Sequence, residues 1–432
     1  MTTRTSTSGT GVEDEEWYHG LLPREDLAYL MRNSGDFLVR TSEPKAGTER
    51  QLVISIMVND PKMPIRHVII LRSPKGQYTI DADGVLTFSA VTDLIAHYEE
   101  NHISVLKNCE AFLVTPIRRQ QWELRHDDVQ LVQKLGEGAF GDVHRGVLRL
   151  PMNRSVDVAV KLAKMTEMTK EKIKEIMKEA RLMRYYDHPN VVRLYGVVVE
   201  AEPLMIVMEF VNGGALNEYL RKSTASTDEK LKNMTTQAAW GLEYLHSKQC
   251  IHCDIAARNC LYANGNTVKI SDFGLSREGK AYRMTQARRV PIKWLAPETL
   301  TSLTYTAKSD VWSYGVMVWE IFANGMEPYQ GMSSVQASEK VISGYKMSMP
   351  TETPDAVVEL VVENCWAMNP ERRYTMAQVA RALEAITTCA QPSSSQSVSG
   401  SSKTKSKMPP IQKEKPGSRR GKRSHRRRSK KK

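Results

Sequence analysis

The sequence predicts an α+β protein with two folded domains, and three observations lead to this prediction. A chain of 432 residues is too long for one ordinary hydrophobic core and suits two domains with appended segments. About one hundred residues near the N-terminus follow the order helix, strands, helix, which is typical of a small α+β domain. A second block begins with strands around a glycine-rich turn and becomes predominantly helical after about Asn212.

The charge of the chain is concentrated in its last residues. The formal net charge is +12, and residues 391–432 contain 15 lysines and arginines against one acid, Glu414. This segment therefore carries +14, which leaves −2 for the rest of the chain. The sequence thus predicts nearly neutral folded domains and a basic, disordered tail, and it argues against a basic surface that covers a whole domain.

The six cysteines are scattered along the chain, a pattern typical of reduced thiols in a cytosolic protein. Cys250 and Cys253 form a Cys-x-x-Cys pair with Cys260 nearby, but a fourth zinc ligand is missing, so we favour inert thiols. No apolar run approaches the roughly 20 residues that a helix needs to cross a bilayer. We therefore expect a cytoplasmic protein.

The elements of the first block follow from their periodicity. Apolar positions with helical spacing predict a helix within residues 22–34, and a second helix is predicted over 90–100. Between them, short β-type runs predict strands at 36–40, 51–58, 65–71 and 77–80.

A phosphate-binding pattern lies at the start of this block. Alternation along the first strand puts Phe37 and Val39 on one face, and Leu38 and Arg40 on the other, so Arg40 is expected to be buried. A buried guanidinium needs a partner, and its planar fork matches the oxygens of a dianionic phosphate. With the Trp17-Tyr18-His19-Gly20 stretch, this pattern closely resembles the SH2 family. The resemblance implies a phosphotyrosine pocket formed by Arg24, Arg40, Ser42 and His67.

The second block opens with the glycine-rich run 136–141, where the backbone can approach a triphosphate closely. Such a run alone equally suits a dinucleotide fold or a hairpin. About 20 residues later Lys161 ends a Val-Ala-Val-Lys strand, and Glu179 lies in a helix with apolar residues at helical spacing. A solvated lysine and a surface acid are each plausible singly, but poor explanations of the two together.

Two further motifs complete the pattern. Residues 251–259 read Ile-His-Cys-Asp-Ile-Ala-Ala-Arg-Asn, and residues 272–274 read Asp-Phe-Gly. In this order the motifs resemble the protein kinase family, whose fold has two lobes. The resemblance implies that Lys161, paired with Glu179, binds the α- and β-phosphates and that Asp254, followed by Arg258, orients the attacking hydroxyl. Asn259 and Asp272 are then the ligands of Mg²⁺, with Mn²⁺ as the alternative metal.

The same resemblance implies which residues bind ATP. They are Leu135, Gly136, Glu137, Gly138, Ala139, Phe140, Gly141, Val143, Ala159, Lys161, Glu179, Met208, Glu209 and Leu261. The apolar members would be core residues in any fold, so they support the assignment without deciding it. Glu298 and Arg373 match a structural ion pair of the family's lower lobe.

Two features favour tyrosine over serine as the substrate. Serine/threonine kinases usually place a lysine two residues after the catalytic aspartate, whereas this chain has Ala256 there and Arg258 two residues further on. The Pro-Ile-Lys-Trp stretch at 291–294 is also the tyrosine-kinase form. Over residues 17–388 the chain resembles the Fes/Fer group most, without the long membrane-curving region that precedes the SH2 domain in that group.

The chain departs from the kinase pattern at Cys253, where relatives have an arginine that contacts the phosphorylated activation-loop tyrosine. Cysteine has no positive charge and is only a weak donor. Tyr282 occupies the matching loop position and is the candidate phosphorylation site, and Arg277 could supply part of the missing charge. We therefore hypothesise that phosphorylation of Tyr282 stimulates this enzyme less than its relatives.

The resulting domain prediction has five segments. They are a disordered N-terminus (1–16), an SH2 domain (17–115), a linker (116–128), a protein tyrosine kinase domain (129–389) and a basic disordered tail (390–432). The expected function is transfer of the ATP γ-phosphate to protein tyrosines, with recruitment to phosphotyrosine partners. The alternative is a phosphotyrosine-binding adaptor whose pseudokinase domain serves as a scaffold.

The tail leaves several partners open. It could contact an anionic membrane surface, act as a nuclear import signal or tether nucleic acid. We place the cytoplasmic face of the plasma membrane slightly ahead of the nucleus. No aromatic residues are interleaved with the basic ones, so no specific nucleic acid is predicted.

Overall fold

The computed structural model describes residues 11–43, 48–81, 83–138, 141–164, 169–263, 266–285 and 290–388. These residues fall within one contact-defined unit, Met1–Gln391. The predicted basic tail, Cys389 and two predicted ATP-binding residues, Ala139 and Phe140, lie outside the described residues.

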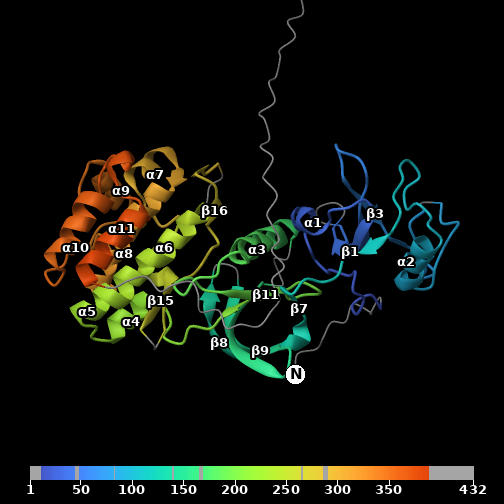
Figure 1. The fold of residues 1–432 in the computed structure, drawn as a ribbon, viewed down its shortest axis with the longest axis horizontal. Coiled ribbons are helices and arrows are strands. Elements are labelled where there is room, and N and C mark those ends of the chain that lie inside the picture. The colour runs from blue at the N-terminus through green and yellow to red at the C-terminus, as the bar shows by residue number, and fades with distance from the viewer. Residues whose placement is uncertain are drawn as a thin grey trace, which may run out of the picture. The chain divides into compact units, whose positions relative to one another are not determined.

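In the first domain, one helix precedes the first five strands along the chain and a second helix follows them (Figure 1). Its elements are α1 (Arg24–Leu30), β1 (Asp36–Ser42), β2 (Gln51–Met57), β3 (Ile65–Ile69), β4 (Leu71–Arg72), β5 (Tyr78–Thr79), α2 (Val91–Glu100) and β6 (Thr115–Pro116). The main sheet has the order β3-β2-β1-β6, with β6 parallel to β1. The predicted alternation along β1 is observed, because Phe37 and Val39 join one buried cluster and Leu38 joins another.

The next segment builds a six-stranded sheet and one long helix. Its elements are β7 (Glu123–Leu124), the 3₁₀ helix η1 (His126–Asp128), β8 (Val129–Gly138), β9 (Gly141–Leu150), β10 (Arg154–Leu162), α3 (Lys170–Met183), β11 (Leu194–Val198) and β12 (Met205–Glu209). The sheet order is β7-β11-β12-β10-β9-β8. The linker thus contributes the edge strand β7, which pairs in parallel with β11.

The remaining segment is mainly helical. Its helices are α4 (Leu216–Lys222), α5 (Thr227–Glu229), η3 (Lys230–Thr236), α6 (Gln237–Ser247), η4 (Ala257–Asn259), η5 (Ile292–Trp294), α7 (Pro297–Ser302), α8 (Ala307–Phe322), α9 (Ser334–Ile342), α10 (Asp355–Glu359), η6 (Leu360–Cys365), η7 (Pro370–Arg372) and α11 (Met376–Thr387). Its short strands are β13 (Cys250–Ile251), β14 (Cys260–Ala263), β15 (Thr267–Ile270), β16 (Arg277–Glu278), β17 (Ala281–Arg283) and β18 (Thr304–Thr306).

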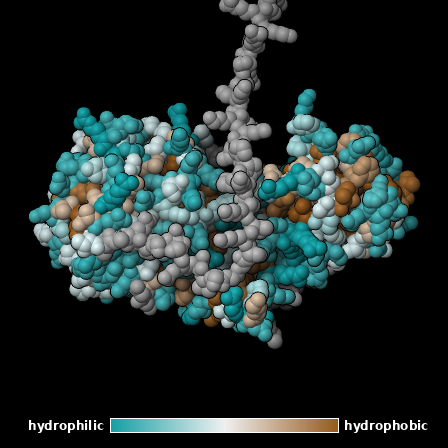
Figure 2. All heavy atoms as spheres, in the orientation of Figure 1, coloured by the Kyte–Doolittle hydropathy of each residue, from teal (hydrophilic) through white to brown (hydrophobic). Residues whose placement is uncertain are grey.

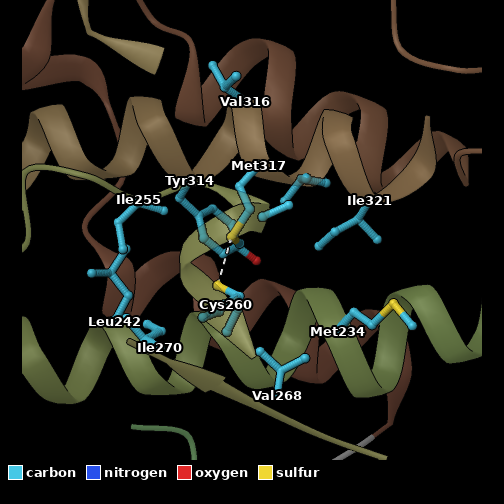
Figure 3. Close-up of a cluster of buried hydrophobic side chains, with 14 of the residues drawn as sticks. Met234, Leu242, Ile255, Cys260, Val268, Ile270, Tyr314, Val316, Met317 and Ile321 are labelled. Carbon is cyan, nitrogen blue, oxygen red and sulfur yellow. Dashed lines mark hydrogen bonds between the residues drawn. The ribbon is translucent and has the colours of Figure 1, made fainter. Parts of the chain in front are cut away.

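Helix α8 is the centre of this lobe, because 13 of its 16 residues are buried. Figure 3 shows Tyr314, Met317 and Ile321 of α8 directed towards side chains of other elements, among them Cys260 at the start of β14. The Sγ atom of Cys260 lies 3.4 Å from the Sδ atom of Met317.

A separate buried cluster joins the first domain to the six-stranded lobe. It contains Leu22, Leu27 and Leu38 from the first domain together with residues of α3 and β11. The approach is close enough to require glycine at position 20, since a Cβ atom there would lie 2.1 Å from the carbonyl oxygen of Val199. The backbone N–H of Leu21 donates to that same oxygen, at 2.7 Å.

The N-terminal segment differs from the prediction of disorder over residues 1–16. Among these residues, 11–16 are described, and Val12 is fully buried in the core that holds Phe37 and Val39. A single valine beside an acidic run has no periodicity, so its burial depends on contacts that only the folded domain provides.

The view in Figure 2 is mainly hydrophilic with smaller hydrophobic patches. Among the described helices, none has the length and apolar character that a membrane crossing requires.

Candidate functional site

The first candidate site is the hollow that contains Arg40. Arg40 is only 1% exposed, and its Nε donates to the hydroxyl of Ser55 at 3.1 Å. Its Nη2 has no hydrogen-bond partner among the described residues. Burial, followed by the nearby charge of Arg24, lowers the pKa of Arg40 to about 10. A buried guanidinium with an unused donor is costly unless an anion binds to it.

The other predicted residues of this pocket lie around Arg40. Arg24 and Ser42 line the same hollow. His67 Nδ1 lies 3.1 Å from the Ser55 hydroxyl, so Ser55 connects His67 to Arg40. Burial and the positive charges of Arg40, Arg24 and Lys170 lower the pKa of His67 to about 3. His67 is therefore neutral at pH 7, and the positive charge of the hollow comes from arginine and lysine.

The second candidate site begins at the glycine-rich turn between β8 and β9. Gly138 and Gly141 face each other across this turn, and Gly141 has φ +144°. A Cβ atom at Gly141 would lie 1.9 Å from the carbonyl oxygen of Leu162, so only glycine fits there. Glu137 pairs with Lys164 at 2.6 Å.

The neighbouring strands bring the predicted adenine-contacting residues together. Ala159 of β10 is opposite Met208 of β12, and Lys161 is opposite Val143 of β9. Leu261 of β14 forms a bridge with Ala215, which precedes α4. Leu135 is exposed, and the carboxylate of Glu209 pairs with Lys269 at 3.0 Å.

Lys161 and Glu179 form the ion pair that the kinase resemblance implies. The Nζ atom of Lys161 lies 3.0 and 3.3 Å from the two carboxylate oxygens of Glu179. Glu179 is 4% exposed, and burial raises its pKa while Lys161 opposes that rise. The negative charge of Asp272 also raises the pKa of Glu179, so the Asp-Phe-Gly aspartate lies within electrostatic range of this pair.

The catalytic-loop residues are held by one another. Arg258 donates to the carboxylate of Asp254, and Asn259 donates from Nδ2 to the carbonyl oxygen of Asp254 at 2.8 Å. Burial raises the pKa of Asp254, Arg258 lowers it, and Asp272 again adds a rise. Asp272 is thus near both Glu179 and Asp254, and it is exposed, with φ +61°.

Phe273 of the Asp-Phe-Gly segment belongs to a large cluster of buried apolar side chains. Met183 belongs to the same cluster, against which Leu194 packs. The rings of His252 and Phe273 lie 5.2 Å apart, centre to centre. The position of the Asp-Phe-Gly segment is therefore supported by side chains from α3, β11 and the catalytic loop.

Among the described residues, the positive charge that acts on Cys253 is that of Arg277. Cys253 is 6% exposed and belongs to a small buried cluster against which Tyr282 packs. The Arg277 guanidinium lies 4.7 Å from the centre of the Tyr282 ring and donates to the carbonyl oxygens of Leu275 and Ser276. Tyr282 is opposite Tyr305 in the β17–β18 pair. Arg277 is therefore a cation beside the ring of Tyr282, and its Nη1 already donates to two backbone carbonyl oxygens.

The buried thiols have environments that disfavour the thiolate. Burial raises the pKa of both Cys250 and Cys260 to about 12, and it is also the largest cause of the raised pKa of Cys253. Within the ranges that the structure describes, no group of three or more His, Cys, Asp or Glu side chains is arranged to hold a metal ion.

The sequence analysis missed an ionic contact between the first domain and α3. Asp26 of α1 is 1% exposed and accepts bonds from Arg181 at 2.9 and 2.7 Å and from Arg184 at 2.9 Å. The Arg184 guanidinium also lies 3.9 Å from the ring centre of Trp122 in the linker. Since α3 carries Glu179, this contact connects the first domain to the helix of the catalytic ion pair. An aspartate on the apolar side of a helix is the signal that could have revealed it.

Comparison with known proteins gives matches to both domains. The family described as "SH2 domain" matches residues 17–98, and "Protein tyrosine and serine/threonine kinase" matches residues 129–383. Fer-related kinase 1 of Caenorhabditis elegans is 40% identical over 385 residues, which cover 88% of this chain and 97% of that protein. Human tyrosine-protein kinase Fer is 38% identical over 387 residues, 88% of this chain but 45% of Fer. The transforming protein Fps of avian sarcoma virus (strain PRCII) is 38% identical over 376 residues, 86% of this chain and 68% of Fps.

Proposed function

The chain belongs to the Fer/Fps family of SH2-containing protein-tyrosine kinases, and from this premise we propose which of its residues perform the reaction. Members transfer a phosphoryl group from ATP to tyrosine hydroxyls of proteins and use a divalent metal ion. The observation that carries our assignment is the ion pair of Lys161 and Glu179, in which nitrogen and oxygen lie 3.0 Å apart. Asp272 lies within electrostatic range of both Glu179 and Asp254.

In the proposed mechanism, Lys161 binds the α- and β-phosphates and is held in place by Glu179. Asp254 accepts a hydrogen bond from the tyrosine hydroxyl and orients it, and burial makes this carboxylate more basic than a solvated one. Arg258, which contacts Asp254, keeps that side chain in place. Phosphoryl transfer depends mainly on alignment and on compensation of charge, which these residues provide.

We propose Mg²⁺ as the metal, bound by Asp272 and Asn259, with Mn²⁺ as a substitute. Both side chains offer hard oxygen atoms, and the exposed carboxylate of Asp272 is accessible. Mg²⁺ usually binds to one or two carboxylates together with substrate phosphates rather than to a cage of protein ligands. This donor set therefore fits Mg²⁺. When bound, the ion neutralises charge on the phosphates.

The test is phosphorylation of a glutamate–tyrosine copolymer by the purified chain with ATP and MgCl₂, detected with a phosphotyrosine antibody. We expect Asp254→Asn, which keeps the size of the side chain, to lower kcat by roughly 10²- to 10⁴-fold. Glu339→Gln, an exposed substitution on α9, is the control and should leave the rate unchanged. Equal rates for wild type and Asp254→Asn would contradict the assignment, and no activity in wild type would favour the adaptor function.

For the SH2 domain we propose that Arg40 binds the phosphate of phosphotyrosine in partner proteins, with Arg24, Ser42 and neutral His67 around it. The support is the unused Nη2 donor of Arg40 in a hollow that Arg24 and Ser42 also line. A bidentate bond from guanidinium to phosphate would use this donor.

For localisation we propose the cytoplasm, with residues 391–432 contacting the anionic cytoplasmic leaflet of the plasma membrane. The support is the charge of +14 in this segment and the additive attraction of Lys and Arg to anionic lipid. Sedimentation with vesicles tests it: we expect binding to vesicles that contain phosphatidylserine and none to neutral phosphatidylcholine vesicles. Nuclear accumulation without vesicle binding would favour the import signal instead.

A further inference from the structure

The hollow around Arg40 is lined by residues of both domains. Leu21, Leu22, Pro23, Arg24, Arg40, Thr41, Ser42, Glu43 and Arg50 come from the SH2 domain, while Lys170, Ile173 and Lys174 come from α3 of the kinase domain. The first turns of α3 thus form one wall of the pocket that we assign to phosphotyrosine.

Lys170 is the kinase-domain residue best placed to contact an anion there. It is the first residue of α3, and its Nζ donates to the carbonyl oxygen of Glu43, directly after β1, at 3.3 Å. Its positive charge also contributes to the lowered pKa of His67, after burial and the charges of Arg40 and Arg24. Lys174 differs, because its Nζ pairs with the carboxylate of Glu25 at 2.8 Å and part of its charge is compensated.

The two domains are held together beside the hollow, so Lys170 does not depend on a flexible approach. Asp26 is bonded to Arg181 and Arg184, and Arg50 pairs with Glu202 at 2.6 Å. The apolar cluster that contains Leu22 and Leu38 also contains Ile173, one turn from Lys170. Ionic and apolar contacts therefore fix the start of α3 against the SH2 domain.

We propose that Lys170 of the kinase domain binds the phosphate of phosphotyrosine together with Arg40 of the SH2 domain, so that one phosphotyrosine is bound by both domains at once. The proposal rests on the proposed function of the Arg40 pocket. Arg40, whose Nη2 has no hydrogen-bond partner among the described residues, and the ammonium of Lys170 both line the hollow, and a dianionic phosphate has enough oxygens to accept from both.

The test measures binding of free O-phosphotyrosine, which makes no peptide contacts, to the full chain by calorimetry. We expect Lys170→Ala to weaken binding about five-fold, because the lysine is partly exposed and its bond to phosphate is screened by water. Lys170→Arg should retain most of the affinity. Lys172→Ala is the matched control, since it removes the same charge in the same helical turn but does not line the hollow. The dependence of affinity on NaCl should also become less steep in Lys170→Ala.

A second variant tests whether the docked arrangement is required. Asp26→Lys places a like charge against Arg181 and Arg184 and should separate the domains. In that background Lys170→Ala should cause little further loss, so the two substitutions should be strongly non-additive. Full additivity would overturn the proposal.

The failure of this inference can be told apart from failure of the pocket assignment. If Arg40→Met abolishes binding while Lys170→Ala and Lys172→Ala both bind as wild type does, the pocket assignment stands and the two-domain site is wrong. If Arg40→Met binds as wild type does, both are wrong.

Discussion

Among the described residues, Arg373 and Arg40 are the two most deeply buried arginines, and they differ in what surrounds them. Arg373 in the kinase domain is 2% exposed and makes two bonds of 2.7 Å to the carboxylate of Glu298. Its Nε donates to the carbonyl oxygen of Ala367, and Nη1 donates to that of Lys308. Arg40 in the SH2 domain is 1% exposed and bonds to Ser55, with no carboxylate partner among the described residues.

This difference separates a structural charge from a binding charge. The guanidinium of Arg373 is satisfied within the fold, so its burial is compensated by the protein itself. The guanidinium of Arg40 has an unused donor and a pKa lowered to about 10, so its burial is compensated only when an anion binds. Stability and binding should therefore respond in opposite ways when each arginine is replaced.

The largest expected effect is the loss of stability in Arg373→Met. Because the substitution leaves Glu298 without its partner and removes bonds to three backbone carbonyls, we expect the free energy of unfolding to fall by about 3–5 kcal/mol. Urea denaturation followed by circular dichroism measures this change. Arg372→Met, at the exposed neighbouring position, is the control and should shift it by less than about 0.5 kcal/mol. Similar losses in both variants would show that Arg373 is not a structural charge.

The opposite pattern is expected for Arg40→Met. We expect binding of a tyrosine-phosphorylated peptide to lose about 2–4 kcal/mol, because one partner of a buried charge pair is removed. Without peptide, the free energy of unfolding should be unchanged or higher by about 1 kcal/mol, since an incompletely paired buried charge is replaced by an apolar side chain. A destabilisation as large as that of Arg373→Met would show that Arg40 is a structural charge as well.

The sequence predicted both arginines, but for different reasons. Alternation along β1 predicted the burial of Arg40 from neighbouring residues alone, and the order of motifs identified both domain types, which the family matches confirm. The Glu298–Arg373 pair came from the kinase resemblance, because the two residues are far apart in sequence.

The residues that join the two domains were not predicted, since an aspartate on the apolar side of a short helix does not by itself say which surface it meets. Neither Asp26 nor Lys170 was singled out from the sequence. The glycine at position 20 was used only as part of the SH2 resemblance. In the structure it is where the SH2 domain approaches the carbonyl oxygen of Val199.

Glu320 carries a third kind of buried charge, one that makes the stability of the fold depend on pH. Its carboxylate is 3% exposed and accepts bonds of 2.9 Å from the Ala257 N–H and the Trp294 Nε1–H. Burial raises the pKa of Glu320 to about 7, and these bonds only partly oppose the rise. The folded protein can therefore hold the side chain of Glu320 in its neutral, protonated form.

Because its pKa is higher in the folded than in the unfolded protein, folded Glu320 binds more protons between about pH 4.5 and 7. This contribution to stability is present below that window and is lost as the pH rises through it. As the pH rises through this window, the free energy of unfolding of the wild type should fall. We expect it to fall by about 2 kcal/mol less in Glu320→Gln, whose carbonyl oxygen can accept both hydrogen bonds. Urea denaturation at several pH values measures the slope, with Glu339→Gln as the exposed control. Equal slopes in wild type and Glu320→Gln would contradict the prediction.

The smallest expected effect concerns a missing charge, at Cys253. Tyr282 packs beside the buried thiol, and the guanidinium of Arg277 lies over its ring while donating to two backbone carbonyls. Among the described residues, Arg277 is the cation found beside this ring, and it is already engaged in other bonds, so phosphorylation should order the activation loop weakly. We expect Tyr282→Phe to lower the initial rate less than about three-fold, a change of under about 1 kcal/mol in activation free energy.

The matched test restores the charge. In Cys253→Arg a guanidinium stands next to Tyr282, where it can form charge-assisted bonds to the phosphate. We therefore expect preincubation with ATP to stimulate Cys253→Arg more than wild type, and the stimulation to disappear in the Cys253→Arg, Tyr282→Phe double variant. Initial rates on the tyrosine copolymer, before and after preincubation, measure both. A ten-fold loss of the initial rate in Tyr282→Phe, with Cys253 unchanged, would contradict this prediction. It would show that Arg277 is sufficient as the partner of the phosphate and that the charge absent from position 253 does not limit the response.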